Sequence, residues 1–202
     1  MKAIIKKKIN YMTEILFELL SNEKTDEIIN FIFNNREKGV IFCGVGKNWY
    51  IAQKLTKTFI SLGIPAQALD AIHALHGDIG MINNQTIFFI SKSGNTFELI
   101  SLIEYLIFIR DKKIIDPFLI GVSLNSQPKM KELTDLFLCS KGNKIYEFDD
   151  RNIVPTLSIN ILQMLLDYVG VEIYEKSVEL TENYKFHHPG GIIGEKFKKD
   201  LL

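Results

Sequence analysis

The stretch Thr86-Ile-Phe-Phe-Ile-Ser-Lys-Ser-Gly-Asn-Thr96 decides the fold of this chain. Its first half, Thr86 to Ile90, is a short apolar run rich in β-branched and aromatic residues, which predicts a buried strand. A loop of small and hydroxyl-bearing residues follows, and then the segment Phe97–Arg110, which predicts a helix that is apolar nearly all round. Such a helix needs burial on more than one side, so it is either central to the fold or part of a subunit interface, and we favour the interface.

The same alternation of strand and helix continues in both directions along the chain. An amphipathic helix is expected from Ile5 to Leu19, because apolar residues recur there at spacings of three and four. Short apolar strands that alternate with helices predict a parallel sheet covered by helices on both faces. The further expected strands are Gly39–Cys43, Ala66–Leu69, Phe118–Val122 and Leu136–Cys139, and the further expected helices begin at Thr25, follow Gly46, follow Pro128 and run from Thr156 to Val169, closed by Gly170.

Composition limits the classes of partner. The chain has 202 residues, of which 47% are hydrophobic, and this is enough for one domain with a sizeable core. We expect a single domain over residues 1–202, with the N-terminal helices of residues 1–38 packed on it. Twenty-four basic residues balance 24 acidic ones, so no overall field favours nucleic acid or a membrane surface. The two cysteines lie in apolar runs and no signal-type segment follows the basic N-terminus, so we expect a cytoplasmic protein.

Two loops combine a preceding strand with a following helix, and in such sheets ligands bind beyond the carboxyl ends of the strands. In the loop 91–96, three hydroxyl groups surround Gly94 at the start of a helix, where unpaired N–H groups favour an anion. This pattern predicts a phosphate site, although an ordinary hydroxyl N-cap would look similar. The loop Gly44-Val-Gly-Lys-Asn48 fits neither a P-loop nor a complete dinucleotide fingerprint. Its glycines predict a tight turn that places Lys47 at the mouth of the site, or a plain turn with a solvated lysine.

Taken without the rest of the chain, two histidines and three acidic residues give no sign of a metal site or a catalytic site. His73 and His76 stand three residues apart, but no third ligand at suitable spacing accompanies them, so we expect no metal site. Glu147, Asp149 and Asp150 taken alone would indicate a solvated turn.

Taken together, these segments resemble one known family. The motif Ser91-x-Ser-Gly-x-Thr96 after a strand is similar to the phosphate loop of the sugar-isomerase (SIS) family. Within that family, the order and spacing of four further segments resemble the arabinose-5-phosphate isomerases, over roughly residues 35 to 197. These segments are Gly44-Val-Gly-Lys47, His76-Gly-Asp-Ile-Gly-Met81, Val154-Pro-Thr156 and His188-Pro-Gly-Gly-Ile-Ile-Gly194.

The resemblance implies a three-layer α/β/α sandwich with a five-stranded parallel sheet of flavodoxin-like type, and a homo-oligomer, with a tetramer favoured, whose sites lie at subunit contacts. It implies interconversion of ribulose 5-phosphate and arabinose 5-phosphate through an enediolate, as an early step towards the Kdo sugar of lipopolysaccharide or capsule, without metal or organic cofactor. By this resemblance, the family's catalytic positions correspond to Lys47, His76, Glu147 and His188. The family's substrate-binding positions correspond to Gly44, Gly46, Ser91, Ser93, Asn95, Thr96 and Thr156.

Two departures from the family pattern bear on function. Asn95 stands where members usually carry glutamate, and an asparagine cannot carry a proton as a carboxylate can. Many members also have a C-terminal pair of CBS domains, and we expect no regulation through such domains here. Another SIS sugar-phosphate isomerase or lyase, and a non-catalytic sugar-phosphate sensor, therefore remain open as alternatives.

Overall fold

The computed structural model describes residues 2–141 and 146–201 of the chain, which contain a five-stranded, fully parallel sheet. The strand order is β2-β1-β3-β4-β5, and all four neighbouring pairs are parallel. The order reverses between β1 and β3, as in doubly wound sheets. The strands are β1 Val40–Gly44, β2 Ala66–Asp70, β3 Thr86–Ser91, β4 Phe118–Ser123 and β5 Leu136–Cys139.

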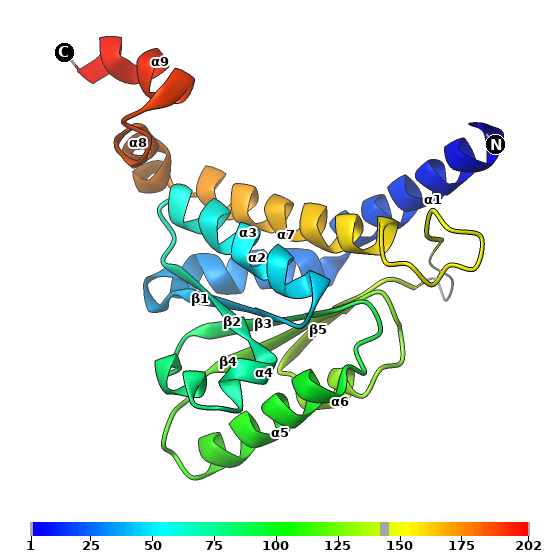
Figure 1. Ribbon diagram of the computed structural model, residues 1–202. Helices are drawn as coiled ribbons and strands as arrows, with labels where there is room; N and C mark the ends of the chain where they lie inside the picture. Colours follow the sequence, from blue (N-terminus) through cyan, green and yellow to red (C-terminus); the bar gives the residue numbers. More distant parts are fainter. Residues whose placement is uncertain (1, 142–145, 202) are drawn as a thin grey trace.

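Helices cover both faces of this sheet, which confirms the predicted three-layer α/β/α architecture (Figure 1). One face carries α1 Lys2–Leu20, α2 Glu23–Asn35, α3 Lys47–Ser61 and α7 Leu157–Glu175; the other carries α4 Ala71–Ala74, α5 Phe97–Asp111 and α6 Met130–Leu133. Two helices, α8 Val178–His187 and α9 Gly191–Leu201, follow α7 and lead away from the body, and short 3-10 turns occur at Arg36–Lys38 and Asp78–Met81.

The strands are apolar throughout because each face of the sheet has its own core. Alternate residues of a strand point to opposite faces. Phe42 and Phe88 therefore pack with α3 and α7, whereas Ile41 and Phe89 pack with α5 on the other side. All four side chains are fully buried.

The boundaries of α7 and α2 differ from the prediction for reasons that the structure shows. Gly170 does not close α7, which continues through it to Glu175. A Cβ at Gly170 would lie 2.7 Å from the ring of Phe59, so the glycine allows α3 and α7 to pack closely. Helix α2 begins at Glu23 rather than Thr25, because the side chain of Asn22 caps it by accepting the N–H of Lys24. Thr25 lies buried within the helix, and its hydroxyl donates to the carbonyl of Leu19.

Helix α5 has one face buried against the sheet and another that carries exposed aromatic side chains. Leu99, Leu102 and Leu106 are buried, whereas Phe97 is 77% exposed and Phe108 is 53% exposed. Assignment of this helix to a subunit contact stays a prediction. In the part of the chain that the structure describes, no helix combines the length and the apolar character needed to cross a bilayer.

Candidate functional site

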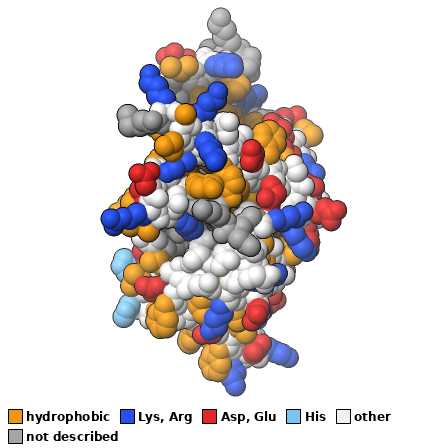
Figure 2. Space-filling model, turned by 90° about the vertical axis from the view of Figure 1, so that its right-hand side faces the viewer, with side chains coloured by type: hydrophobic (Ala, Val, Ile, Leu, Met, Phe, Trp, Pro, Cys, Tyr) orange, Lys and Arg blue, Asp and Glu red, His pale blue; other side chains and the backbone are white. Residues whose placement is uncertain are grey.

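The candidate site lies at the carboxyl edge of the sheet, where the strand order reverses. After β1 the chain enters α3 on one face, and after β3 it enters α5 on the opposite face. The loops 44–47 and 91–96 therefore lead to opposite faces of the sheet, and this is the position at which doubly wound sheets bind their ligands. In Figure 2, which looks onto this end of the molecule, an area just below the middle of the surface is white, the colour of uncharged polar side chains and backbone.

The loop 91–96, which we call the serine loop, forms a compact arrangement of hydroxyl groups. Ser91 is buried, and its Oγ lies 2.9 Å from Oγ1 of Thr96 and accepts the N–H of Gly94 at 3.0 Å. Ser93 is exposed, and its Oγ accepts the N–H of Asn95. Gly94 has φ +63°, and a Cβ there would lie 2.5 Å from Pro128, so the turn requires glycine.

The start of α5 lacks the side-chain cap that an ordinary hydroxyl N-cap would provide. Thr96 is the N-cap residue, but its side chain caps none of the helix N–H groups. Its hydroxyl interacts with Ser91 instead. A helix start without a side-chain cap offers N–H groups and a positive dipole end, and both favour a phosphate.

The loop after β4 supports the serine loop from outside, a role that was not predicted. Ser123 donates to the carbonyl of Lys92 at 3.1 Å, and the Asn125 amide donates to the carbonyl of Ser93 at 3.1 Å. The N–H of Lys129 donates to Oδ1 of Asn95 at 2.7 Å. Asn95, predicted to bind substrate, is thus held by a backbone contact. The polar run directly after the apolar strand Phe118–Val122 was the available signal for these residues.

The loop after β1 is the tight turn that its glycines predict. A Cβ at Gly44 would lie 2.6 Å from the backbone of Asn48, and Gly46 has φ +60°. Lys47 is the first residue of α3 and is exposed at this edge of the sheet.

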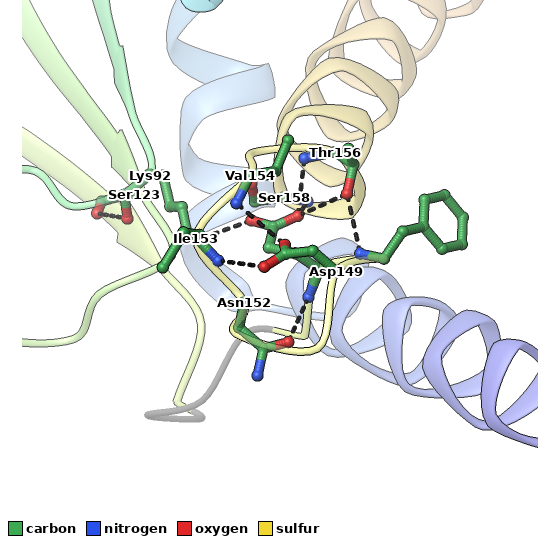
Figure 3. A network of polar contacts seen from close by, with 10 residues as sticks. Lys92, Ser123, Asp149, Asn152, Ile153, Val154, Thr156 and Ser158 are labelled. Carbon is green, nitrogen blue, oxygen red and sulfur yellow. Dashed lines mark hydrogen bonds and ion pairs between the residues drawn. The ribbon is translucent and has the colours of Figure 1, made fainter.

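Glu147 is the most constrained polar side chain of the site. It is fully buried, and its Oε1 accepts from Nζ of Lys92 at 2.5 Å (Figure 3). Its Oε2 accepts the N–H of Thr156 at 2.8 Å, the hydroxyl of Thr156 at 3.1 Å and the N–H of Ser158 at 3.2 Å. The carboxylate therefore joins the serine loop to the start of α7.

The environment of Glu147 favours its ionised form. Burial raises the pKa of this carboxyl group, but the hydrogen bonds from Lys92, Ser158 and Thr156 outweigh burial, and the net pKa is lowered. A carboxylate held in this way is a weak proton acceptor until Lys92 moves away. Lys92 was not among the predicted site residues, because its partner lies 55 positions along the chain.

The two predicted histidines lie at different ends of the molecule. His76 is exposed in the turn that follows α4, and therefore lies at the carboxyl edge beyond β2. His188 follows α8, where its Nδ1 lies 3.2 Å from the carbonyl of Tyr184. The neighbouring His187 contacts the carbonyl of Ser61 at the last residue of α3.

The end of α3 is remote from the candidate site. Lys47 begins α3 and Ser61 ends it, so the 15-residue helix separates the two by about 21 Å. Figure 1 shows α8 at the end of α7 opposite the segment 146–156. Within one chain, the structure brings Lys47, the serine loop, Glu147 and Thr156 to one edge of the sheet, and it leaves His188 at the other.

Comparison with known proteins agrees with this geometry. The family model for the SIS domain matches residues 35–164. An uncharacterized protein of Rickettsia prowazekii is 32% identical over 203 residues, covering 98% of this chain and 60% of the relative. The arabinose 5-phosphate isomerase KdsD of Yersinia pestis is 33% identical over 176 residues, covering 87% of this chain and 51% of KdsD.

Among solved structures, c3406 of Escherichia coli CFT073 in complex with arabinose 5-phosphate superposes with a TM-score of 0.77 at 25% identity, covering 93% of this chain and 96% of that one. This chain spans about half to three-fifths of the length of the two curated relatives.

Proposed function

Since this chain belongs to the SIS domain family, we propose that it is a sugar-phosphate isomerase that interconverts arabinose 5-phosphate and ribulose 5-phosphate. The observation that carries the proposal is the hydroxyl-rich serine loop at the uncapped start of α5. The similarity to KdsD and to the E. coli protein bound to arabinose 5-phosphate supports the choice of sugar. A role early in Kdo synthesis, in the cytoplasm, is part of the same proposal.

The phosphate group binds to the serine loop in this proposal. Ser93 is exposed there, and the first-turn N–H groups of α5 point towards the loop. Asn95 and Thr96 complete the loop, and the backbone of Gly44 and Gly46 faces it from the neighbouring strand end, where the ligand can approach closely. The sugar chain then extends towards Glu147 and Thr156.

Isomerisation needs a base that removes the proton from C2 of the aldose and a group that returns it to C1. Glu147 or His188 takes the role of base, and Lys47 and His76 stabilise the developing enediolate oxygen or assist ring opening. When the anionic substrate binds, it draws the Lys92 ammonium group away from Glu147. Loss of this contact raises the pKa of the carboxylate, so that it can accept the substrate proton.

His188 reaches such a site only from a second copy of the chain. It lies on the arm formed by α8 and α9, at the opposite end from Lys47. We therefore place each site between two subunits, in agreement with the tetramer that the family resemblance implies. Mixing two inactive variants, Glu147→Gln and His188→Ala, then restores about a quarter of wild-type turnover in a two-fold assembly, because some sites combine both intact residues. If both residues act within one chain, the mixture stays inactive.

The activity is tested by following pentose and hexose phosphates by NMR with the purified chain. We expect arabinose 5-phosphate to give ribulose 5-phosphate without added metal and in the presence of a chelator. Turnover of hexose or other pentose phosphates but not of arabinose 5-phosphate would refute the substrate and keep the reaction class.

A sugar-phosphate sensor is the second candidate, and the state of Glu147 favours it. The carboxylate is saturated by four contacts to Lys92, Thr156 and Ser158, and Asn95 brings no proton-carrying group. Exchange of the C2 hydrogen of arabinose 5-phosphate with deuterated solvent separates the two functions. An isomerase catalyses the exchange, whereas a sensor binds the sugar without it.

A further inference from the structure

The N-terminal helix α1 lies outside the residues 35–164 that match the family model, yet it contacts the segment that carries Glu147. Its second half packs on the core through Ile15, Leu16 and Leu19. Its first half exposes Ile4 and Ile5 but buries a lysine, Lys8, which is only 9% exposed. A buried lysine requires a specific set of partners.

Those partners are the backbone carbonyls directly after Glu147. Nζ of Lys8 donates to the carbonyl of Phe148 at 3.1 Å and to that of Asp149 at 3.0 Å. It also lies 3.8 Å from the carboxylate of Asp150, whose side chain is 98% exposed and contributes little. The two carbonyl contacts therefore account for the burial of the ammonium group.

Helix α1 also holds the chain before Glu147. The ring of Tyr11 packs edge-on against Tyr146, with 4.7 Å between ring centroids. The carboxylate of Glu18 accepts the backbone N–H of Lys141, close to the end of β5. The contacts of α1 thus flank Glu147 on both sides.

The segment between Glu147 and α7 is irregular and depends on such contacts for its shape. Inside the segment, Asn152 accepts the N–H of Glu147 at 2.9 Å, and Thr156 accepts the N–H of Phe148 at 3.1 Å. These bonds satisfy the N–H groups, and Lys8 secures the carbonyls from the outside. Figure 3 shows the segment bridging the serine loop and the start of α7.

We propose that Lys8 is a positioning residue that holds the segment after Glu147, and with it the Glu147 carboxylate, in place between Lys92 and the start of α7. The inference deepens the proposed isomerase function and rests on it for its kinetic consequence. Helix α1 then contributes to the geometry of the site, although the Lys8 ammonium group contacts the backbone carbonyls that follow Glu147 rather than its carboxylate.

The test compares Lys8→Met with Lys7→Met in the full chain, because Lys7 is the exposed neighbour of Lys8 on the same helix. Methionine keeps the apolar stem, so α1 can still pack on α7. We expect Lys8→Met to lower kcat for arabinose 5-phosphate by about 10- to 100-fold, as misplacement of a reacting group does. KM should change by less than about twofold, because the phosphate-binding groups lie on another loop. Lys8→Arg should recover part of kcat, since a guanidinium can reach both carbonyls.

Hydrogen exchange gives a readout that does not depend on activity. Lys8→Met should speed amide exchange in peptides covering residues 146–156 and leave those covering 91–96 unchanged, whereas Lys7→Met should alter neither. Unchanged exchange in 146–156, or kcat within twofold of an active wild type, would overturn the role of Lys8. A wild type that isomerises no sugar phosphate would refute the proposed function instead, and the exchange experiment would still decide whether Lys8 holds the segment.

Discussion

Replacing Lys92 with methionine removes the ammonium group that faces Glu147 and keeps a side chain of similar length. The carboxylate is fully buried, but it retains three hydrogen bonds from Thr156 and Ser158. A hydrogen bond to a charged group contributes about 1.5–3 kcal/mol. Loss of one member of a wholly buried ion pair costs about 3–5 kcal/mol. The Lys92 side chain is 30% exposed, so the pair is not wholly buried and the range for a charged hydrogen bond applies. We therefore expect Lys92→Met to lower the free energy of unfolding by about 2 kcal/mol at pH 7.

The chain provides a matched control in the pair Lys129–Glu104. Its N···O distance is also 2.5 Å, but its side chains are 55% and 49% exposed. Exposed pairs contribute about 0.2–1 kcal/mol, so Lys129→Met should cost much less than Lys92→Met. The comparison keeps the type of ion pair and its N···O distance constant and changes its surroundings from buried to exposed.

The cost of Lys92→Met should also depend on pH in a defined direction. The pKa of Glu147 in the folded state is below its ordinary value of 4.5. A carboxyl group with a lowered folded pKa contributes stability that is complete above the unfolded pKa and is lost as pH falls through the folded pKa. The unfolded state is common to wild type and Lys92→Met, so the difference between them should be constant while Glu147 is ionised in both folded proteins and should shrink as the pH falls through the two folded pKa values.

Urea denaturation of both variants and wild type at several pH values measures these differences. The reasoning about Lys92 fails if Lys92→Met costs no more than Lys129→Met at pH 7. It also fails if the cost of Lys92→Met stays the same as the pH is lowered past the titration of Glu147.

Two further predictions concern the loops. Ser93→Ala should weaken binding of the sugar phosphate by about 1–3 kcal/mol, measured by calorimetry, because a hydroxyl that contacts the anion is lost; unchanged affinity would place the phosphate elsewhere. Gly44→Ala should destabilise the protein by about 1–3 kcal/mol, because the new Cβ would lie 2.6 Å from the backbone of Asn48. Gly80→Ala, where a Cβ would meet nothing within 4 Å, is the control in thermal denaturation, and equal midpoints for the two would contradict the argument.

The strands could be predicted from sequence because both faces of the sheet are buried. Continuous short apolar runs such as Thr86–Ile90 are typical of strands in such sheets, and all six residues of β3 are indeed buried. The turn of the serine loop could be predicted from local sequence, because hydroxyl-bearing residues and a glycine between a strand and a helix are typical of such a loop. Glycine at position 170 misled the prediction of α7, because its role is a close contact with Phe59 from another helix.

The contacts that complete the site could not be predicted from local patterns. Lys92 and Glu147 lie 55 positions apart, and Lys8 lies 140 positions from Phe148. Nothing in the neighbourhood of either lysine distinguishes it from a solvated one. His188 shows a different limit, because the motif gave its position along the chain but not the end of the molecule at which it lies.

Asn95 acquires a physical meaning once Lys92 and Glu147 are seen as a pair. A glutamate at position 95 would place a carboxylate in the serine loop, which also carries Lys92, the partner of the buried Glu147. With asparagine, the charges of Lys92 and Glu147 sum to zero, and the amide oxygen still accepts the N–H of Lys129 at 2.7 Å. Asparagine therefore keeps the connection between the two loops and adds no negative charge to the loop that binds phosphate in the proposed function. In the proposed isomerase, the proton-carrying group that a glutamate at position 95 would supply is replaced by Glu147, released from Lys92, or by a histidine of a second chain.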